Sequence, residues 1–348
     1  MGIPAIIRFI TWGLIVALWT CGAQAAIEAG KPEKHSPELK AIRDILAMPE
    51  DRINLAEARL RVEKYLDPFI DIKANLAEIE RIYAAIKTVP RYKETVEGKL
   101  NGLIQYLYHP GKWNDNTPYH YDFDDPLGTA KPQNSRISNY LKTRRGNCVS
   151  MPILMLILGK KLGLDMSLST APLHLFVQLK DQGHVFNVEA TAGGLKAKES
   201  YIKEFLISPE ALQNGLYLQS LSKKETFVVM MEGVARKYSE SDQNKDFDKA
   251  FELTSLMLEH YPNYPSAMII RGNVWRNIMH RDLELTKKKG IKQMTPPMKK
   301  HFDELLKRNS QWYAKAESIG WREPPKDYDE RYLRMVSEAR KIYEQATH

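Results

Sequence analysis

Apolar residues recur every three or four positions across residues 37–108 and predict a series of amphipathic helices there. Ser36-Pro37-Glu38 is a typical helix start, because it combines a hydroxyl cap, a proline and an early acid. Three stripes with helical spacing follow: Leu55, Ala58, Leu60, Val62 and Tyr65; Leu76, Ile79, Ile82, Tyr83 and Ile86; and Leu100, Leu103, Ile104 and Leu107. We predict that these stripes pack together as an N-terminal helical region.

Residues 109–135 interrupt the helical pattern. Turn formers such as His109-Pro110-Gly111 and Asp124-Asp125-Pro126 follow one another here, so we predict a long loop. The neighbouring acids of this loop lack the spacing of a calcium-binding loop, and we predict no metal site.

Helical spacing returns over residues 135–143 and again from Ser150. The second of these helices is apolar nearly all round, which is typical of a helix in the middle of a domain. Gly163 is expected to end it, and Pro152 fits only in its first turn. The helix therefore has to begin close to Cys148.

The period of the pattern then changes to two, which predicts strands over residues 173–179 and 184–189. Lys180-Asp181-Gln182-Gly183 between them is a hairpin turn signal. We predict a small antiparallel sheet here, with a turn centred on Asp181-Gln182.

This turn would place His174 directly opposite Glu189, and the Cβ atoms of opposed residues are about 5 Å apart. Asn187 would meet His174 only diagonally. We therefore take Glu189 as the acid that orients His174, and Asn187 as the reserve. His184 lies at the turn and His120 in the loop, so both are weaker candidates.

Cys148 lies in Arg144-Arg145-Gly146-Asn147-Cys148-Val149-Ser150, just before the apolar helix. The other cysteine, Cys21, falls in an N-terminal leader, so the exported chain would carry one thiol without a partner. Such a cysteine is either a small buried residue or a thiol kept for chemistry. A helix N-terminus and an imidazole both favour a thiolate, and Cys148, His174 and Glu189 together have the residue types of an acyl-transfer triad. Backbone N–H groups at the helix start are candidates for holding the oxyanion.

These motifs resemble the transglutaminase-like superfamily. The resemblance covers residues 136–194 well and residues 40–205 loosely, and four segments carry it: Arg145-Gly146-Asn147-Cys148, Leu162-Gly163-Leu164, Pro172-Leu173-His174-Leu175-Phe176-Val177 and Asn187-Val188-Glu189-Ala190-Thr191. It implies a papain-like α+β fold, in which a cysteine at a helix start packs on an antiparallel sheet that carries the histidine and the acid.

The resemblance also implies that Cys148 is the nucleophile and His174 the base. Glu189 lies where the family usually has aspartate. Glutamate is one methylene longer, so this departure concerns the role of the acid that orients His174. The bacterial branch with a helical N-terminal region, which the chain resembles, includes members without the cysteine. The resemblance therefore leaves two hypotheses open, an enzyme and a non-catalytic binding protein.

The remainder of the chain has helical spacing, with helices expected over residues 227–238, 246–260 and from 267, and breaks near Pro262, Pro296-Pro297 and Pro324-Pro325. Gly233, Tyr238, Ala250, Ala267 and Gly272 resemble one tetratricopeptide unit, although the interval between the two glycines exceeds the usual period of about 34 residues. A plain helical bundle is the alternative.

The first residues predict a secretory signal. Arg8 precedes the apolar run over residues 9–20, and Ala23-Gln24-Ala25 is a cleavage signal. We expect cleavage near Ala25 and a periplasmic or secreted protein without a membrane span. An inner-membrane anchor left by an uncleaved signal is the main alternative, and a lipoprotein on Cys21 is a weaker one.

We therefore predict a signal peptide (1–25), a linker (26–36), a helical N-terminal region (37–108), a papain-like transglutaminase-like core (109–220) and a helical, tetratricopeptide-like domain (221–348). The net charge of +8 on 348 residues is mild and fits solvated helix faces. No nucleotide loop or nucleic-acid motif occurs, so we expect no cofactor and no nucleic acid as partner.

The first functional hypothesis is a cysteine-dependent amide hydrolase or acyltransferase that acts on a protein or peptide, with hydrolysis preferred to cross-linking. The second is a catalytically inactive scaffold that binds an envelope protein through its C-terminal helices.

Overall fold

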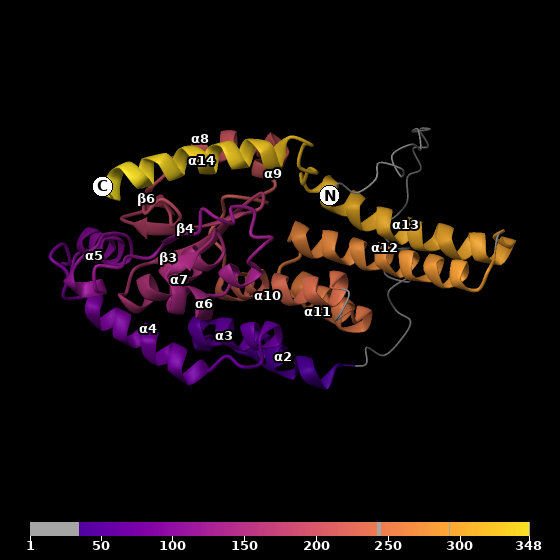
Figure 1. Cartoon of the computed structure of the whole chain (residues 1–348), viewed down its shortest axis with the longest axis horizontal. Coiled ribbons are helices and arrows are strands. Elements are labelled where there is room, and N and C mark those ends of the chain that lie inside the picture. Colours follow the sequence, from indigo (N-terminus) through magenta and orange to yellow (C-terminus); the bar gives the residue numbers. More distant parts are fainter. Residues whose placement is uncertain (1–34, 242–244, 292, 348) are drawn as a thin grey trace. The chain divides into compact units, whose positions relative to one another are not determined.

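The structure is a computed structural model that describes residues 35–241, 245–291 and 293–347. Residues 36–348 form one compact unit (Figure 1). The predicted signal peptide and nearly all of the linker lie outside the described residues. Among the residues that are described, no helix is long and apolar enough to span a membrane.

The N-terminal region is helical, as predicted. Its elements are η1 (Pro37–Leu39), α2 (Lys40–Ala47), η2 (Glu50–Arg52), α3 (Leu55–Leu66), α4 (Ile72–Ile86) and α5 (Val96–Tyr108). The side chains of Asn54, Asp71 and Thr95 cap α3, α4 and α5 by accepting backbone N–H groups. Most residues of the predicted stripes are buried, so the helical spacing identified this part of the core correctly.

The predicted loop follows, with two short 3-10 turns, η3 (Lys112–Asn114) and η4 (Pro132–Ser135). Within it, β1 (His120–Tyr121) pairs in parallel with β2 (Arg145–Gly146), which leads to Cys148. The helix expected over residues 135–143 is α6 (Ile137–Thr143).

The apolar helix is α7 (Ser150–Lys161), and every residue from Ser150 to Gly159 is buried. It packs against β3 (Met166–Ala171) and β4 (His174–Asp181). Gly163 follows it in the left-handed conformation, with φ of 77°. The chain thus places the start of a fully buried helix next to Cys148, as the pattern predicted.

The predicted antiparallel sheet has four strands in the order β3-β4-β5-β6, where β5 is His184–Glu189 and β6 is Gly194–Leu195. The turn between β4 and β5 is Gln182-Gly183, and both residues have positive φ (46° and 82°), as a two-residue type I′ turn requires. The turn is therefore one residue further along the chain than predicted.

This turn makes the predicted register wrong by two residues. Asp181 pairs with His184, so Glu189 is not directly opposite His174. Because side chains alternate with a period of two, a shift by two residues keeps both on the same face of the sheet. They are diagonal neighbours, which a long side chain can still bridge.

The rest of the chain is helical: α8 (Lys198–Glu204), α9 (Pro209–Gln213), α10 (Lys223–Glu240), α11 (Phe247–His260), α12 (Pro265–Lys288), α13 (Pro296–Ser318) and α14 (Tyr328–Thr347). The breaks fall at the predicted prolines. Neighbouring helices from α10 to α13 pack on one another, and α12 and α13 lie side by side (Figure 1). One hydrophobic cluster extends from Leu39 to Val336 across these regions.

A buried ion pair connects three helices behind the site. Arg59 of α3 donates from Nε to Glu63 at 2.7 Å and from a terminal nitrogen to the carbonyl oxygen of Met230 in α10 at 3.1 Å. Glu63 also accepts the backbone N–H groups of Ile137 and Ser138 at 2.6 and 3.1 Å. Its carboxylate thus lies at the positive end of α6, the helix that leads to the Cys148 loop.

We predict that Glu63→Gln lowers the free energy of unfolding by about 3 kcal/mol or more, because it leaves the buried Arg59 without its counter-charge. Urea denaturation measures this loss. Glu57→Gln on the same helix is the matched control, since Glu57 pairs with Arg61 in solvent and should cost no more than about 0.5 kcal/mol. Equal losses in the two variants would contradict the role given to Glu63.

Candidate active site

Cys148 lies in a tight cap at the start of α7. The side-chain oxygen of Asn147 accepts the N–H groups of Val149 and Ser150 at 3.0 and 3.3 Å. Ser150 Oγ accepts the N–H of Asn147 at 3.2 Å in return. The backbone N–H of Cys148 has no hydrogen-bond partner among the described residues, so it is the one donor of this turn that is available to an oxyanion.

Position 146 at the same turn requires a glycine, because the side chains of Ser150 and Tyr140 lie close to its backbone. A Cβ atom there would lie 2.6 Å from Ser150 Oγ and 2.7 Å from the ring of Tyr140. Because both neighbours are buried, any side chain at position 146 would push the Cys148 loop away from α7.

The hairpin turn between β3 and β4 meets Cys148 from the other side. It consists of Pro172 and Leu173, since Ala171 pairs with His174. Leu173 has a φ of 56°, which is uncommon for a residue with a branched side chain. Its carbonyl oxygen lies 3.9 Å from the sulfur of Cys148 and can accept a weak hydrogen bond from the protonated thiol. The turn therefore brings the start of β4, with His174, to the thiol.

His174 is held by Glu189. The Nε2 atom of the ring lies 2.8 Å from a carboxylate oxygen of Glu189, and both side chains are buried. The other carboxylate oxygen accepts the N–H and the hydroxyl of Thr191 at 3.0 and 2.7 Å. Tyr201 donates its hydroxyl to Glu189 as well, at 3.0 Å, and the ring of Phe205 stacks on His174 with centroids 4.7 Å apart.

The electrostatics favour a charged pair. Burial by itself would lower the pKa of His174, but the Glu189 carboxylate and Cys148 outweigh it and raise the pKa above its usual value. Burial would raise the pKa of Glu189, whereas His174 and the Thr191 donors hold it below its usual value. At neutral pH His174 is therefore an imidazolium and Glu189 a carboxylate.

One nitrogen of His174 is left for chemistry. Nδ1 is buried and has no hydrogen-bond partner among the described residues, while the charge and hydrogen-bonding capacity of Cys148 act on the ring. With Nε2 occupied by Glu189, Nδ1 is the atom that can exchange a proton with the thiol.

The structure brings Cys148, His174 and Glu189 together and places the other candidates elsewhere. Asn187 accepts a hydrogen bond from Gln178 at 3.0 Å and does not contact His174. His184 is exposed beside the hairpin turn. The Nδ1 atom of His120 hydrogen-bonds to the carbonyl oxygen of Tyr121 at 2.9 Å, and its ring stacks on Tyr343.

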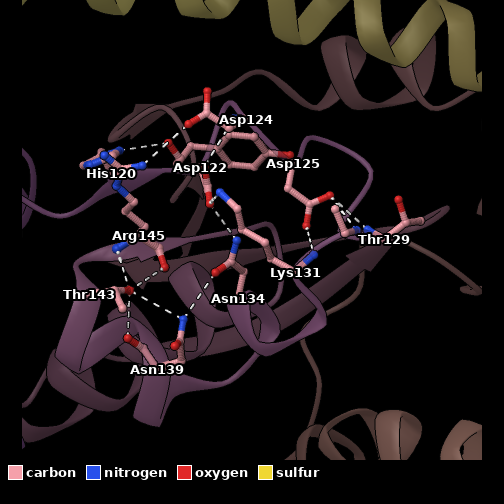
Figure 2. A network of polar contacts seen from close by, with 12 residues as sticks. His120, Asp122, Asp124, Asp125, Thr129, Lys131, Asn134, Asn139, Thr143 and Arg145 are labelled. Atoms are coloured by element: carbon pink, nitrogen blue, oxygen red, sulfur yellow. Dashed lines mark hydrogen bonds and ion pairs between the residues drawn. The ribbon is translucent and has the colours of Figure 1, made fainter.

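The acids of the long loop serve its own structure, as Figure 2 shows. Asp122 accepts the ammonium of Lys131 at 2.9 Å and the amide of Asn134 at 2.8 Å, and Asp125 accepts the backbone N–H groups of residues 129–131. Within the described parts of the chain, no three His, Cys, Asp or Glu residues converge as metal ligands would.

Sequence reasoning missed the residues around the triad. Tyr201 and Phe205 are four positions apart, so their helical spacing was the available signal. Tyr328 of α14 also approaches the site, since its hydroxyl donates to the carbonyl oxygen of Pro172 at 3.4 Å. Burial, and then the charge of Cys148, raises the pKa of Tyr328 and of Tyr332. They are more than 150 positions further along the chain, and no local pattern connects them with Cys148.

Comparison with known proteins agrees with this geometry. The family model described as "Transglutaminase-like superfamily" matches residues 73–231, a span that contains the cysteine, the histidine and the acid.

Two curated relatives are UPF0162 proteins of Xylella fastidiosa. The one from strain Temecula1 is 20% identical over 66% of this chain and 80% of its own length, and the one from strain 9a5c is 19% identical over 62% and 75%. A crystal structure of menin aligns with a TM-score of 0.43 and 15% identity, over 89% of this chain and 67% of that one.

The family match and the arrangement of α7 on the antiparallel sheet agree with each other: residues 73–231 are similar to the transglutaminase-like superfamily.

Proposed function

We propose that this protein is an exported cysteine-dependent amide hydrolase or acyltransferase that acts on a protein or peptide through a thioester on Cys148. One observation carries the proposal: Glu189 occupies Nε2 of His174, and the other ring nitrogen is left for Cys148. We favour hydrolysis over cross-linking, because no feature of the site suggests that water is excluded in favour of an amine.

In the first half of the reaction the Cys148 thiolate attacks the amide carbonyl carbon. The oxyanion that forms is stabilised by the free N–H of Cys148 at the start of α7. His174 then donates its Nδ1 proton to the leaving nitrogen, the carbon–nitrogen bond breaks, and an amine leaves with the thioester on the sulfur.

In the second half, neutral His174 accepts a proton from water as the oxygen attacks the thioester. The carbon–sulfur bond breaks, the acid product leaves, and the proton returns the site to the thiolate–imidazolium pair. Glu189 keeps its bond to Nε2 throughout and supports the cationic form of His174.

The proposed thiolate–imidazolium pair predicts that alkylation by iodoacetamide has nearly the same rate at every pH between 6 and 8. The raised pKa of His174 keeps the imidazolium present across this range, and the lowered pKa of Glu189 keeps its carboxylate charged down to below pH 4.5. A free thiol with a pKa of about 8.5 would instead react roughly 80-fold faster at pH 8 than at pH 6. Alkylation rates followed by mass spectrometry measure the difference.

His174→Ala should restore the steep pH dependence of a free thiol. If the wild-type protein and His174→Ala show the same steep profile, the pair does not exist in solution and the scaffold hypothesis replaces the enzyme.

The length of the Glu189 side chain should matter as much as its charge. Glu189→Gln removes the charge that supports the imidazolium, and Glu189→Asp is one methylene too short for a diagonal neighbour. Either change should slow alkylation at pH 6 by about tenfold or more, since one pKa unit is a factor of ten. Asn187→Ala is the control and should leave the rate unchanged, because Asn187 bonds to Gln178 instead.

The second candidate function is an inactive scaffold of the cell envelope, and the position of α14 favours it. Tyr328 hydrogen-bonds to Pro172, next to the residue that contacts the Cys148 sulfur, on a face that a substrate would need. On this hypothesis α10–α13 act as a tetratricopeptide-like surface for an envelope protein. Gly272, where a Cβ atom would lie 3.0 Å from the Tyr313 ring, supports close helix packing of that kind.

Export is part of the proposal and predicts a defined start of the mature chain. Cleavage at the signal Ala23-Gln24-Ala25 should give a protein that begins at Ala26 and is found in the periplasm or the medium. Intact mass measurement of the purified protein tests this. A membrane-bound chain that retains Met1 would indicate an uncleaved anchor, and a lipid on Cys21 would indicate a lipoprotein.

A further inference from the structure

Helix α14 returns from the far end of the sequence to the candidate site. It lies on the opposite side of α7 and the sheet from α3 and α4 (Figure 1). The Tyr328 hydroxyl donates to the carbonyl oxygen of Pro172 at 3.4 Å, next to the residue that contacts the Cys148 sulfur. One turn further on, the Tyr332 hydroxyl lies 3.0 Å from that of Tyr121.

The second half of α14 docks on the long loop. The ring of Tyr343 stacks on His120 with centroids 5.9 Å apart and contacts Phe123 at 5.6 Å. Arg340 lies 3.5 Å from Asp124, and both are largely exposed. α14 therefore bridges the two segments that flank Cys148, namely the β3–β4 turn and the loop that pairs with β2.

Tyr328 on this face of α14 lies next to the turn that contacts the Cys148 sulfur, and Cys148 itself remains partly exposed. Burial, and then the charge of Cys148, raises the pKa of Tyr328 to about 12, and the same two causes raise the pKa of Tyr121. Because Tyr328 contacts Pro172 and Tyr332 contacts Tyr121, α14 lies against the turn and the loop on either side of Cys148, where an amide substrate would approach the sulfur.

The docking of α14 is nevertheless light. Val336, which is 8% exposed, is its only buried side chain among residues 328–345, and the remaining contacts described above come from tyrosine side chains and one exposed ion pair. A cavity of about 390 Å³ remains between α8 and α14, and its walls include Phe205, Tyr328, Tyr332 and Met335. A segment with few buried apolar contacts opens at a lower free-energy cost than the whole domain.

The connection to the rest of the molecule suits such an opening. Pro324 and Pro325 precede α14 and interrupt the helical path from α13, so α14 can leave its position without unwinding α13. The surface it leaves contains Pro172, Leu173 and Tyr121, which belong to the transglutaminase-like domain.

We propose that α14 is a displaceable cover that the chain docks on the substrate face of its own Cys148 site, and that the site accepts a protein or peptide only after α14 moves away. This inference rests on the proposed function, because it assigns a substrate to the covered face. The proposal explains why α14 lies over the candidate triad although it contributes no residue to the chemistry.

Val336→Asp in the full-length protein tests the cover, since a charge at its only buried position disfavours docking. Alkylation of Cys148 is followed with two reagents, iodoacetamide and a maleimide carrying a long polyethylene glycol chain. The measured quantity is the ratio of the alkylation rate with the large reagent to that with the small one. We expect this reagent ratio to be at least tenfold higher in Val336→Asp than in the wild-type protein. Leu333→Asp is the matched control, because Leu333 is 39% exposed on the same helix and the change should leave the ratio unaltered.

Amide hydrogen exchange of the unmodified protein gives a second test that needs no substitution. Amides of α14 should exchange at least a hundredfold faster than those of α7, which lies in the core. Equal protection of the two helices, or an unchanged reagent ratio in a Val336→Asp protein with native circular dichroism, would overturn the proposal.

These tests separate the cover from the catalytic proposal, since they measure access to the sulfur and not turnover. In a Val336→Asp, His174→Ala double variant the reagent ratio should still rise at least tenfold. The reagent ratio can rise while alkylation of the wild-type protein shows the steep pH profile of a free thiol. That result would retain the cover and reject the triad.

Discussion

The candidate site depends on keeping one buried carboxylate fully hydrogen-bonded. Glu189 is 4% exposed, and an unpaired charge in such a position costs several kcal/mol. Its partners come from three places: His174 on the neighbouring strand, Thr191 in the turn after β5, and Tyr201 on α8. The hairpin, the turn and the helix must all be in place before the charge is stable, so the orientation of the imidazole follows from the fold.

A second buried carboxylate acts on the other half of the site. Glu63 is bound by Arg59 and by the N-terminus of α6, and α6 leads through β2 to Cys148. One acid therefore positions the segment that carries the thiol, and the other positions the imidazole. The short cap formed by Asn147 and Ser150 then fixes the position of Cys148 at the start of α7.

The sequence was sufficient for the elements of the site but not for their register. An unbroken apolar run with Pro152 near its start defined α7, and the period of two defined the hairpin. A turn centred on Asp181-Gln182 and one centred on Gln182-Gly183 give pairings that differ by two residues, and both keep the same side chains on the same face. The apolar pattern repeats every two residues, so it cannot distinguish them.

Long-range contacts explain what else could not be predicted. Arg59 and Glu63 have the spacing of a surface ion pair, and their burial depends on α6 and α10, which are distant in sequence. The contacts of Tyr201, Phe205 and α14 with the site likewise depend on tertiary packing. The transglutaminase-like superfamily usually has aspartate at the position of Glu189. The glutamate of this chain has a physical reason, because the observed register needs the longer side chain to reach His174.

The position of α14 in the sequence has a consequence for how the protein is made. The three residues of the candidate triad and the side chains that bind Glu189 precede residue 206, whereas α14 begins at Tyr328. A ribosome synthesises more than a hundred residues between these points, and domains fold as their segments emerge. Whether the chain emerges from a ribosome or from an export channel, the segments of the candidate site are thus available before α14 is, and during that interval α14 is not yet present to dock beside Cys148.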